Sequence, residues 1–195
     1  MSLEQFSIVA VLLLTVFSFV LFISEEWRWS LIALAVQYVA VFWLVGLNWS
    51  IGLAAVKLAS GWMAAAILSA SQATMQLEEA HFGGRSGQIF RLMVGGLALA
   101  LAFSAEPALA RALPGQPTVL WGGMILIGMG LLQLGMTAQP LRAMLGLLTL
   151  LSGFEILYAV VEFSVLVAGL LALVTLGLAL AGAYLAAAPD MEGGE

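Results

Sequence analysis

Three ionisable side chains lie within, or at the edge of, long apolar stretches of this sequence: Lys57, Glu155 and Glu162. A charge near the centre of a lipid bilayer is costly unless it is paired, hydrated or neutralised. Burial favours the neutral form of such a group, whereas a nearby opposite charge favours its ionised form. A carboxylate and an amine that meet inside a membrane are therefore suited to holding or releasing a proton as their surroundings change.

Two of these residues share a pattern with a tyrosine. Glu155, Tyr158 and Glu162 stand at i, i+3 and i+7, which is one face of a helix if the helix continues to residue 162. Such a face is a hydrophilic stripe for a proton or a cation, and Gln133 in a neighbouring segment would extend it as a hydrogen-bonding wall. The alternatives are structural: Glu155 buried and protonated, Glu162 in a turn, and Lys57 extended toward the membrane surface.

The composition restricts the class of protein. Of 195 residues, 63% are hydrophobic and 9% are charged, whereas soluble domains are about 45–50% apolar and about 25% charged. Mean hydropathy is +1.11, which excludes a soluble enzyme. The net charge is −5 and the sequence has no basic run, so we expect no nucleic-acid partner.

Cofactor chemistry is also restricted by composition. The chain has no cysteine and one histidine, so it cannot by itself hold an iron–sulfur cluster, a thiolate zinc site or a bis-histidine haem. Glu78, Glu79 and His81 lie close together in sequence, but this grouping is more typical of a solvated loop than of a metal site. We therefore expect no cofactor and no metal.

Seven apolar segments punctuated by polar turns are long enough to cross a bilayer, which requires about 20 residues in a helix. We therefore predict an all-α, polytopic transmembrane bundle of about seven spans. The main polar loop is expected at 71–88, a second loop at 106–117, and an acidic tail at 189–195. The predicted spans are 6–23, 29–47, 51–70, 89–105, 118–138, 141–160 and 163–188.

Arginines near the ends of the spans predict the orientation. With seven spans, one side of the membrane holds four of them and Arg111 alone lies on the other side. Cytoplasmic loops carry the excess of basic residues, so the N-terminus is predicted outside and the C-terminus in the cytoplasm. The four residues on the cytoplasmic side are Arg28, Arg85, Arg91 and Arg142.

This topology brings Lys57 and Glu155 into the membrane from the same face. Lys57 is about seven residues from the outer end of its span, or roughly 10 Å deep, and Glu155 is about five or six residues, or roughly 8–9 Å, from the outer end of its own. Because their depths match, we predict that the two side chains share an ion pair or a short water chain.

The segment MTAQPLRAMLGLLTLLSGFEILYAVVEF, residues 136–163, resembles the small three-helix chain 4L (subunit K) of respiratory complex I, and the C subunit of Mrp-type sodium/proton antiporters is similar. In that family an arginine-containing turn precedes a helix of the form LxGLExLxxA with an intramembrane glutamate. The matching positions are Arg142, 148–155 and 156–157. The layout with a lysine in the third span is similar to membrane component E of group 4 hydrogenases. The family's second acid, midway along the last helix, has no counterpart here, since Glu162 precedes that helix.

The first four predicted spans form an N-terminal membrane bundle at 1–117, with polar loop 71–88, and the resemblance implies a chain-4L-like module at 118–188. It implies a non-redox membrane subunit of a proton- or sodium-translocating complex of the respiratory or hydrogenase type, surrounded by lipid in a bacterial or archaeal cytoplasmic membrane. Antiporter-like membrane subunits would be its partners, and the chain would not be catalytic alone.

The main alternative is a structural subunit that seals and scaffolds a larger membrane complex. Its support is the number of small residues in the fifth and seventh spans and the lack of sizeable extramembrane segments. It predicts that bulky residues at Gly128 or Gly177 disturb assembly. A lipid-modifying enzyme would need a cluster of nucleophile, acid or metal ligands, and a free-standing transporter usually shows an internal repeat; neither feature is evident.

Overall fold

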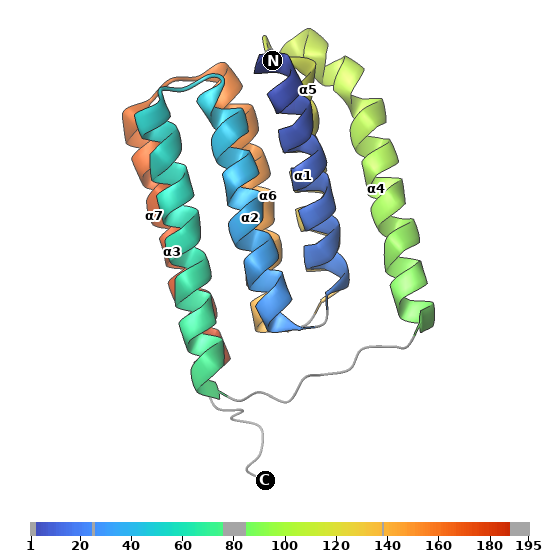
Figure 1. Cartoon of the computed structure of the whole chain (residues 1–195), viewed down its shortest axis with the longest axis vertical. Coiled ribbons are helices and arrows are strands. Elements are labelled where there is room, and N and C mark those ends of the chain that lie inside the picture. The colour runs from blue at the N-terminus through green and yellow to red at the C-terminus, as the bar shows by residue number, and fades with distance from the viewer. Residues whose placement is uncertain (1–2, 25, 76–84, 138, 188–195) are drawn as a thin grey trace.

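The computed structural model describes residues 3–24, 26–75, 85–137 and 139–187. Over these ranges the chain forms seven α-helices and no strand (Figure 1), which confirms the all-α prediction. The helices are α1 (Leu3–Ile23), α2 (Trp27–Gly46), α3 (Ile51–Met75), α4 (Arg85–Ala112), α5 (Pro117–Gly135), α6 (Pro140–Val161) and α7 (Val165–Ala187).

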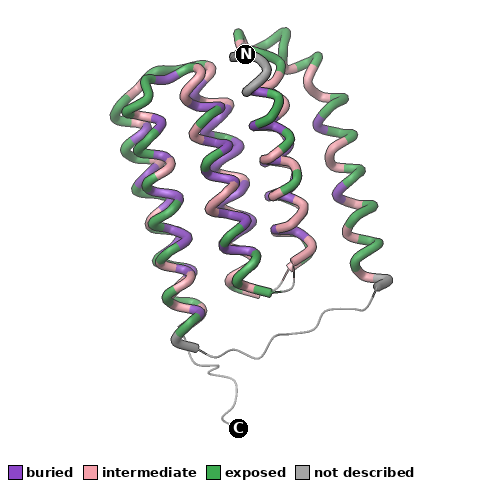
Figure 2. The backbone as a smooth tube through the Cα atoms, viewed as in Figure 1, coloured by how far each residue is buried: buried purple, intermediate pink, exposed green. Residues whose placement is uncertain are grey.

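Six of these helices, α2 to α7, are long and apolar enough to cross a membrane, and α1 contains a shorter apolar segment, Ser7–Ile23. Large apolar side chains cover the outer faces of the helices, for example Leu166, Leu173 and Leu101. Buried positions lie on the inward faces (Figure 2). This distribution is that of a multi-pass helical bundle in lipid, where the outside must be as apolar as the core.

The helices form two layers of three. One layer contains α1, α2 and α3, and the other contains α5, α6 and α7 (Figure 1). Helix α1 packs against α5, α2 against α6, and α3 against α7, while α4 lies at one edge and contacts α5 and α1. Residues 118–188, predicted to be a three-helix module, contain α6, α7 and nearly all of α5.

Hydrogen bonds connect the two layers at both ends of the bundle. At one end, called the Trp49 end, Nε1 of Trp49 in the α2–α3 turn donates to the carbonyl oxygen of Glu162 in the α6–α7 turn, at 3.0 Å. At the opposite end, called the Arg142 end, the Arg142 guanidinium donates to the carbonyl oxygen of Ser24 in the α1–α2 turn, at 2.7 Å. The turns of one layer are thereby fixed against those of the other.

Glycines allow α5 and α6 to approach until their backbones touch. A Cβ atom on Gly130 would lie 2.6 Å from the backbone nitrogen of Leu150, and one on Gly153 would lie 2.7 Å from the carbonyl oxygen of Gly123. Close packing through small residues was expected for the fifth span and is present here. At Gly177, by contrast, a Cβ atom would meet nothing within 4 Å.

Two of the predicted spans were too short. Helix α3 continues to Met75, beyond the expected end at residue 70, because its last turns pack on α7: Gln72 is buried and the Ser71 hydroxyl donates to the carbonyl oxygen of Ala183. Helix α4 extends beyond the predicted span 89–105 at both ends. It begins at Arg85, inside the predicted loop 71–88, and runs to Ala112 with Pro107 inside it, although 106–117 was expected to be a loop.

Pro107 lies on an exposed part of α4. A proline inside a helix removes one backbone hydrogen bond, and its ring crowds the carbonyl group four residues earlier. Prolines are accommodated within membrane helices when local adjustments satisfy the freed backbone groups.

Residues 76–84, which include Glu78, Glu79 and His81, lie outside the described residues.

Candidate functional site: a buried lysine–glutamate pair

Lys57 on α3 and Glu155 on α6 form an ion pair inside the bundle. The Lys57 ammonium donates a hydrogen bond to Oε1 of Glu155, and each side chain is 1% exposed. Lys57 is six residues after the start of α3, and Glu155 is six residues before the end of α6. Both therefore lie about 9 Å from the Trp49 end, and the pairing predicted from matched depth is present as a direct contact.

The inner face of α6 carries the carboxylate together with two hydroxyl groups. Thr149, Ser152 and Glu155 are spaced three residues apart, so they follow one side of the helix, and all three are at most 1% exposed. The Ser152 hydroxyl donates to the carbonyl oxygen of Leu148, which leaves its oxygen free to accept a further hydrogen bond. This face is the polar surface that α6 presents to the opposite layer.

Tyr38 of α2 belongs to the same cluster. Its side chain is 1% exposed, and its ring lies against Gly61 of α3, where a Cβ atom would come within 2.2 Å of the ring. The Tyr38 hydroxyl lies within hydrogen-bonding reach of the hydroxyls of Ser152 and Thr175, and it interacts electrostatically with Glu155. Sequence analysis missed this residue, although a tyrosine in the middle of a predicted span, away from the interfaces where tyrosines concentrate, was a usable signal.

Further polar side chains continue from this cluster toward α1. The Gln37 amide donates to the Thr149 hydroxyl at 3.5 Å, and the Ser18 hydroxyl donates to the Gln37 amide oxygen at 3.4 Å. These contacts link α6, α2 and α1 through residues that are all buried. None of the three was predicted, because a single hydroxyl or amide in an apolar run is common and does not indicate which neighbour it faces.

Gln133, predicted as part of the ion path, lies close to the Arg142 end of α5. It is 5% exposed, and its amide donates to the carbonyl oxygen of Leu21 at 3.4 Å. By helix rise Gln133 is about 24 Å from the Trp49 end, compared with about 9 Å for Glu155. The structure therefore places Gln133 in the buried interior but at a different depth from the ion pair.

Tyr158 and Glu162 lie toward the surface. Tyr158 is half-buried and packs edge-on against Trp49, with ring centroids 6.3 Å apart, and stacks on Phe154 at 6.1 Å. Helix α6 ends at Val161, and Glu162 is an exposed residue with extended backbone. The condition for the i, i+7 stripe is thus not met, because the chain leaves the helix one residue before Glu162 to turn into α7.

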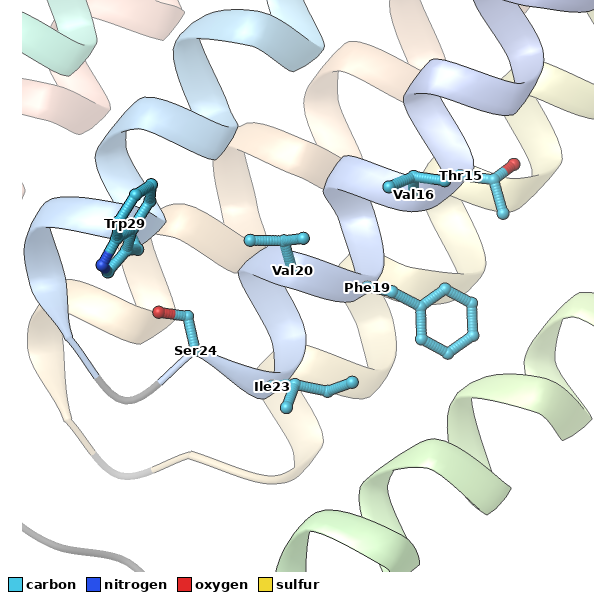
Figure 3. A pocket seen from close by; sticks show the side chains of 7 residues that line it. All are labelled: Thr15, Val16, Phe19, Val20, Ile23, Ser24 and Trp29. Carbon is cyan, nitrogen blue, oxygen red and sulfur yellow. The ribbon is translucent and has the colours of Figure 1, made fainter.

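A separate groove of about 490 Å³ opens on the side of the bundle, along the outer face of α1 (Figure 3). Phe19 and Ile23 line it on the side facing α4, and Trp29 of α2 lines it near the Arg142 end. The lining residues are uncharged, and the surface that they expose to the groove is almost wholly apolar although Thr15 and Ser24 are among them. This groove therefore suits a lipid chain or another apolar group and has no part in the polar cluster.

The fold and the polar cluster define the class of the chain: a multi-pass helical membrane bundle with an ion pair buried among its helices. No group of three or more potential metal ligands occurs among the residues that the structure describes. Comparisons with protein families, with curated proteins and with solved structures found no significant match. The resemblance of residues 136–163 to chain 4L of complex I therefore remains a prediction.

Proposed function

We propose that this chain is a non-redox membrane subunit of a proton- or sodium-translocating complex of the respiratory or hydrogenase type, and that Lys57 and Glu155 form part of its ion path. The observation that carries the proposal is the ion pair, which is 1% exposed on both sides and lies within the apolar bundle. The proposal includes a bacterial or archaeal cytoplasmic membrane, antiporter-like neighbouring subunits and no catalytic activity of the chain alone.

The cost of the pair is the first argument for a functional role. Desolvating two charges costs several kcal/mol per ion, and an apolar pair of similar volume is often as stable or more stable. An ion pair is therefore an inefficient way to hold α3 against α6. Ionisable residues inside membranes usually mark substrate or ion pathways, which favours a functional reason for this pair.

The chemistry of the contact is the second argument. The Lys57 ammonium donates directly to Oε1 of Glu155. Transfer of that proton from Nζ to Oε1 converts an ammonium and a carboxylate into an amine and a carboxylic acid, with no change in total charge. Because the two forms have different solvation energies, a change in nearby charge or hydration shifts their balance. A moving ion in a neighbouring subunit would supply such a change.

The buried side chains beyond the pair are a third support. Ser152 and Thr149 on α6, and Gln37 and Ser18 in the other layer, continue from Glu155 into the interior. They provide hydroxyl and amide groups along the contact between the layers, where an entirely apolar interface would provide none. We assign them to the walls of the proposed path.

A scaffolding role is the second candidate, and one observation favours it. Only 11% of the most apolar window of α4 is buried within the chain, compared with 33–56% for the other five candidate spans. A helix so weakly covered by its own chain has a large surface available for other subunits or for lipid. In this role Lys57 and Glu155 would matter only for stability.

The test compares Glu155→Gln with Glu26→Gln in the native complex. Glu26 is exposed at the Arg142 end, so it controls for the loss of an acid elsewhere in the chain. Native gels measure assembly, and membrane vesicles measure ions pumped per electron transferred, with a protonophore and a sodium ionophore to identify the ion. We expect Glu155→Gln to be less stable, because Lys57 loses its partner, but still to assemble and to pump more slowly at the same electron-transfer rate. Normal pumping by this variant would refute the ion-path role and leave the scaffold.

A further inference from the structure

The groove along the outer face of α1 extends over about the depth of one membrane leaflet. Its lining runs from Thr15, near the middle of α1, to Ser24, just beyond the end of this helix (Figure 3). The rise from Thr15 to Ser24 is about 14 Å, and half of the hydrocarbon core of a bilayer is about 15 Å thick. A chain lying in the groove would therefore begin at the Arg142 end and reach about the middle of the bilayer.

The groove offers apolar surface along its length and no free hydroxyl hydrogen. The hydroxyl of Thr15 donates to the carbonyl oxygen of Val11. The hydroxyl of Ser24 donates to the carbonyl oxygen of Glu26. A hydrocarbon chain fits such a surface, whereas a polar group placed there would lose hydrogen bonds without replacing them.

Arginines lie around the end of the groove that is at the membrane surface. The Arg142 guanidinium donates to the carbonyl oxygen of Ser24, which is one of the lining residues. Arg28 is exposed in the first turn of α2, directly before the lining residue Trp29, and its guanidinium carbon lies 5.3 Å from the centre of the Trp27 ring. Tryptophans near the end of a membrane helix usually lie at the level of the lipid headgroups. Two positive charges are therefore held at headgroup depth beside the groove.

A third arginine comes from α4. A Cβ atom on Gly95 of α4 would lie 2.6 Å from the ring of Phe19, so the two helices meet at the groove. Arg91 precedes Gly95 by four residues and therefore lies on the same face of α4, one turn nearer the Arg142 end. Among the described side chains at this end, Glu26 is the one acid that opposes the three arginines, so positive charge is in excess.

An anionic phospholipid matches both the groove and the charge at its mouth. Each basic residue near a membrane surface strengthens the binding of anionic lipid about fivefold. A zwitterionic phospholipid carries a cationic group as well as its phosphate, so it gains less from an excess of positive charge. A neighbouring apolar helix would cover the groove but would bring no negative charge to its mouth.

We propose that the groove is a binding site for one anionic phospholipid. Its acyl chain lies along α1 between Thr15 and Ile23, and its phosphate lies at the Arg142 end, within reach of the arginines of α2, α4 and α6. The site goes beyond the proposed ion path and does not depend on it, since it is formed by the outer face of α1 and not by the buried ion pair.

Native mass spectrometry of the purified chain in detergent tests the choice of lipid, because it counts the lipids that stay bound to each chain. The two probes are dioleoyl phosphatidylglycerol, which is anionic, and dioleoyl phosphatidylcholine, which has the same acyl chains and is zwitterionic. We expect one phosphatidylglycerol to bind at least about fivefold more tightly than phosphatidylcholine. Equal affinities for the two lipids would overturn the proposal.

Two tryptophan substitutions on α1 test the position of the acyl chain. Val16 lines the groove, whereas Val9 lies two turns away on the same helix, outside the groove and equally exposed, at 57% compared with 56%. Val16→Trp should fill the groove and weaken phosphatidylglycerol binding at least about tenfold, and Val9→Trp should leave it unchanged. Equal binding by the two variants would place the lipid elsewhere and overturn the proposal.

Two further variants test the charge at the mouth. Arg28→Gln should weaken phosphatidylglycerol binding about fivefold without changing that of phosphatidylcholine. Arg111→Gln, which removes an exposed arginine near the opposite end of the bundle, should change neither. Equal effects of the two substitutions would contradict the assigned phosphate position.

The same measurement on the chain purified within its native assembly distinguishes lipid from protein as the occupant. We expect phosphatidylglycerol to remain bound there. Binding to the isolated chain but not to the assembly would assign the groove to a neighbouring subunit and overturn the proposal. None of these measurements involves ion transport, so the lipid site and the ion path can fail independently.

Discussion

Replacing Lys57 by methionine gives the most direct test of the buried pair. Methionine keeps a long, unbranched side chain in the space now occupied by the lysine but removes the ammonium that contacts Oε1 of Glu155. Glu155, 1% exposed, then loses its ion-pair partner. Removing one member of a buried pair costs about 3–5 kcal/mol, because the remaining charge stays buried without compensation.

The same structure predicts that removing both charges is far less harmful. A Lys57→Met/Glu155→Met double variant leaves no buried charge at this site, and apolar replacements of buried pairs are often neutral or stabilising by about 1–4 kcal/mol. In a chain of this size 1 kcal/mol corresponds to about 2–4 °C in the unfolding midpoint. We therefore expect Lys57→Met to lower the midpoint by about 6–20 °C, and the double variant to recover the wild-type value or exceed it.

Thermal unfolding of the purified protein, followed by the fluorescence of its six tryptophans, measures both effects. Glu26→Gln at an exposed position provides the baseline for losing a charge at the surface. A midpoint for Lys57→Met no lower than that of Glu26→Gln would refute the burial of the pair away from bulk solvent. A double variant destabilised by the sum of the two single variants would refute their direct coupling.

Three further predictions follow from contacts elsewhere in the bundle. Gly130→Ala should destabilise the protein by about 1–3 kcal/mol, because the new Cβ atom would lie 2.6 Å from the backbone of α6. Gly177→Ala should instead stabilise α7 by about 0.5–1 kcal/mol, because its Cβ atom would meet nothing within 4 Å. Similar unfolding midpoints for the two variants would contradict the close α5–α6 contact. Trp49→Phe should cost about 1 kcal/mol by removing the 3.0 Å bond to the Glu162 carbonyl, and an unchanged midpoint would show that this bond does not stabilise the Trp49 end. The chain has no cysteine, so a single introduced cysteine reports its own side of the membrane. In the predicted orientation a membrane-impermeant maleimide added to intact cells should label Gln116→Cys, which lies outside, and should label Gln139→Cys, which lies in the cytoplasm, only after permeabilisation. The reverse pattern would show that the orientation is opposite to the predicted one.

Much of the site could be anticipated because depth in a membrane can be counted along the chain. Lys57 and Glu155 were predicted to meet from their distances to the ends of their spans, and the helix positions that set these distances changed little in the structure. The stripe through Glu162 required the helix to continue past the predicted end of the span at residue 160. Helix α6 ends at Val161, close to that predicted end, so Glu162 lies in the turn into α7 and not on the face of α6.

The residues that sequence analysis missed share one property: their importance comes from neighbours far away in the chain. Tyr38 enters the cluster because Gly61 leaves room for its ring, and Gln37 is connected because Thr149 faces it from the other layer. Each is an ordinary residue within its own helix. Its role appears only when the packing of one layer on the other specifies which side chains face each other.

The sequence by itself determined that this protein is a bundle of apolar helices with a lysine and a glutamate at similar depth, because hydrophobic length and the cost of intramembrane charge can be read locally. Only the tertiary structure decided that α3 and α6 bring those two charges into contact and that Tyr38, Ser152 and Thr175 gather beside them. The physical reason is that helices in lipid choose their neighbours by shape and by pairing of polar groups, and both depend on several helices at once.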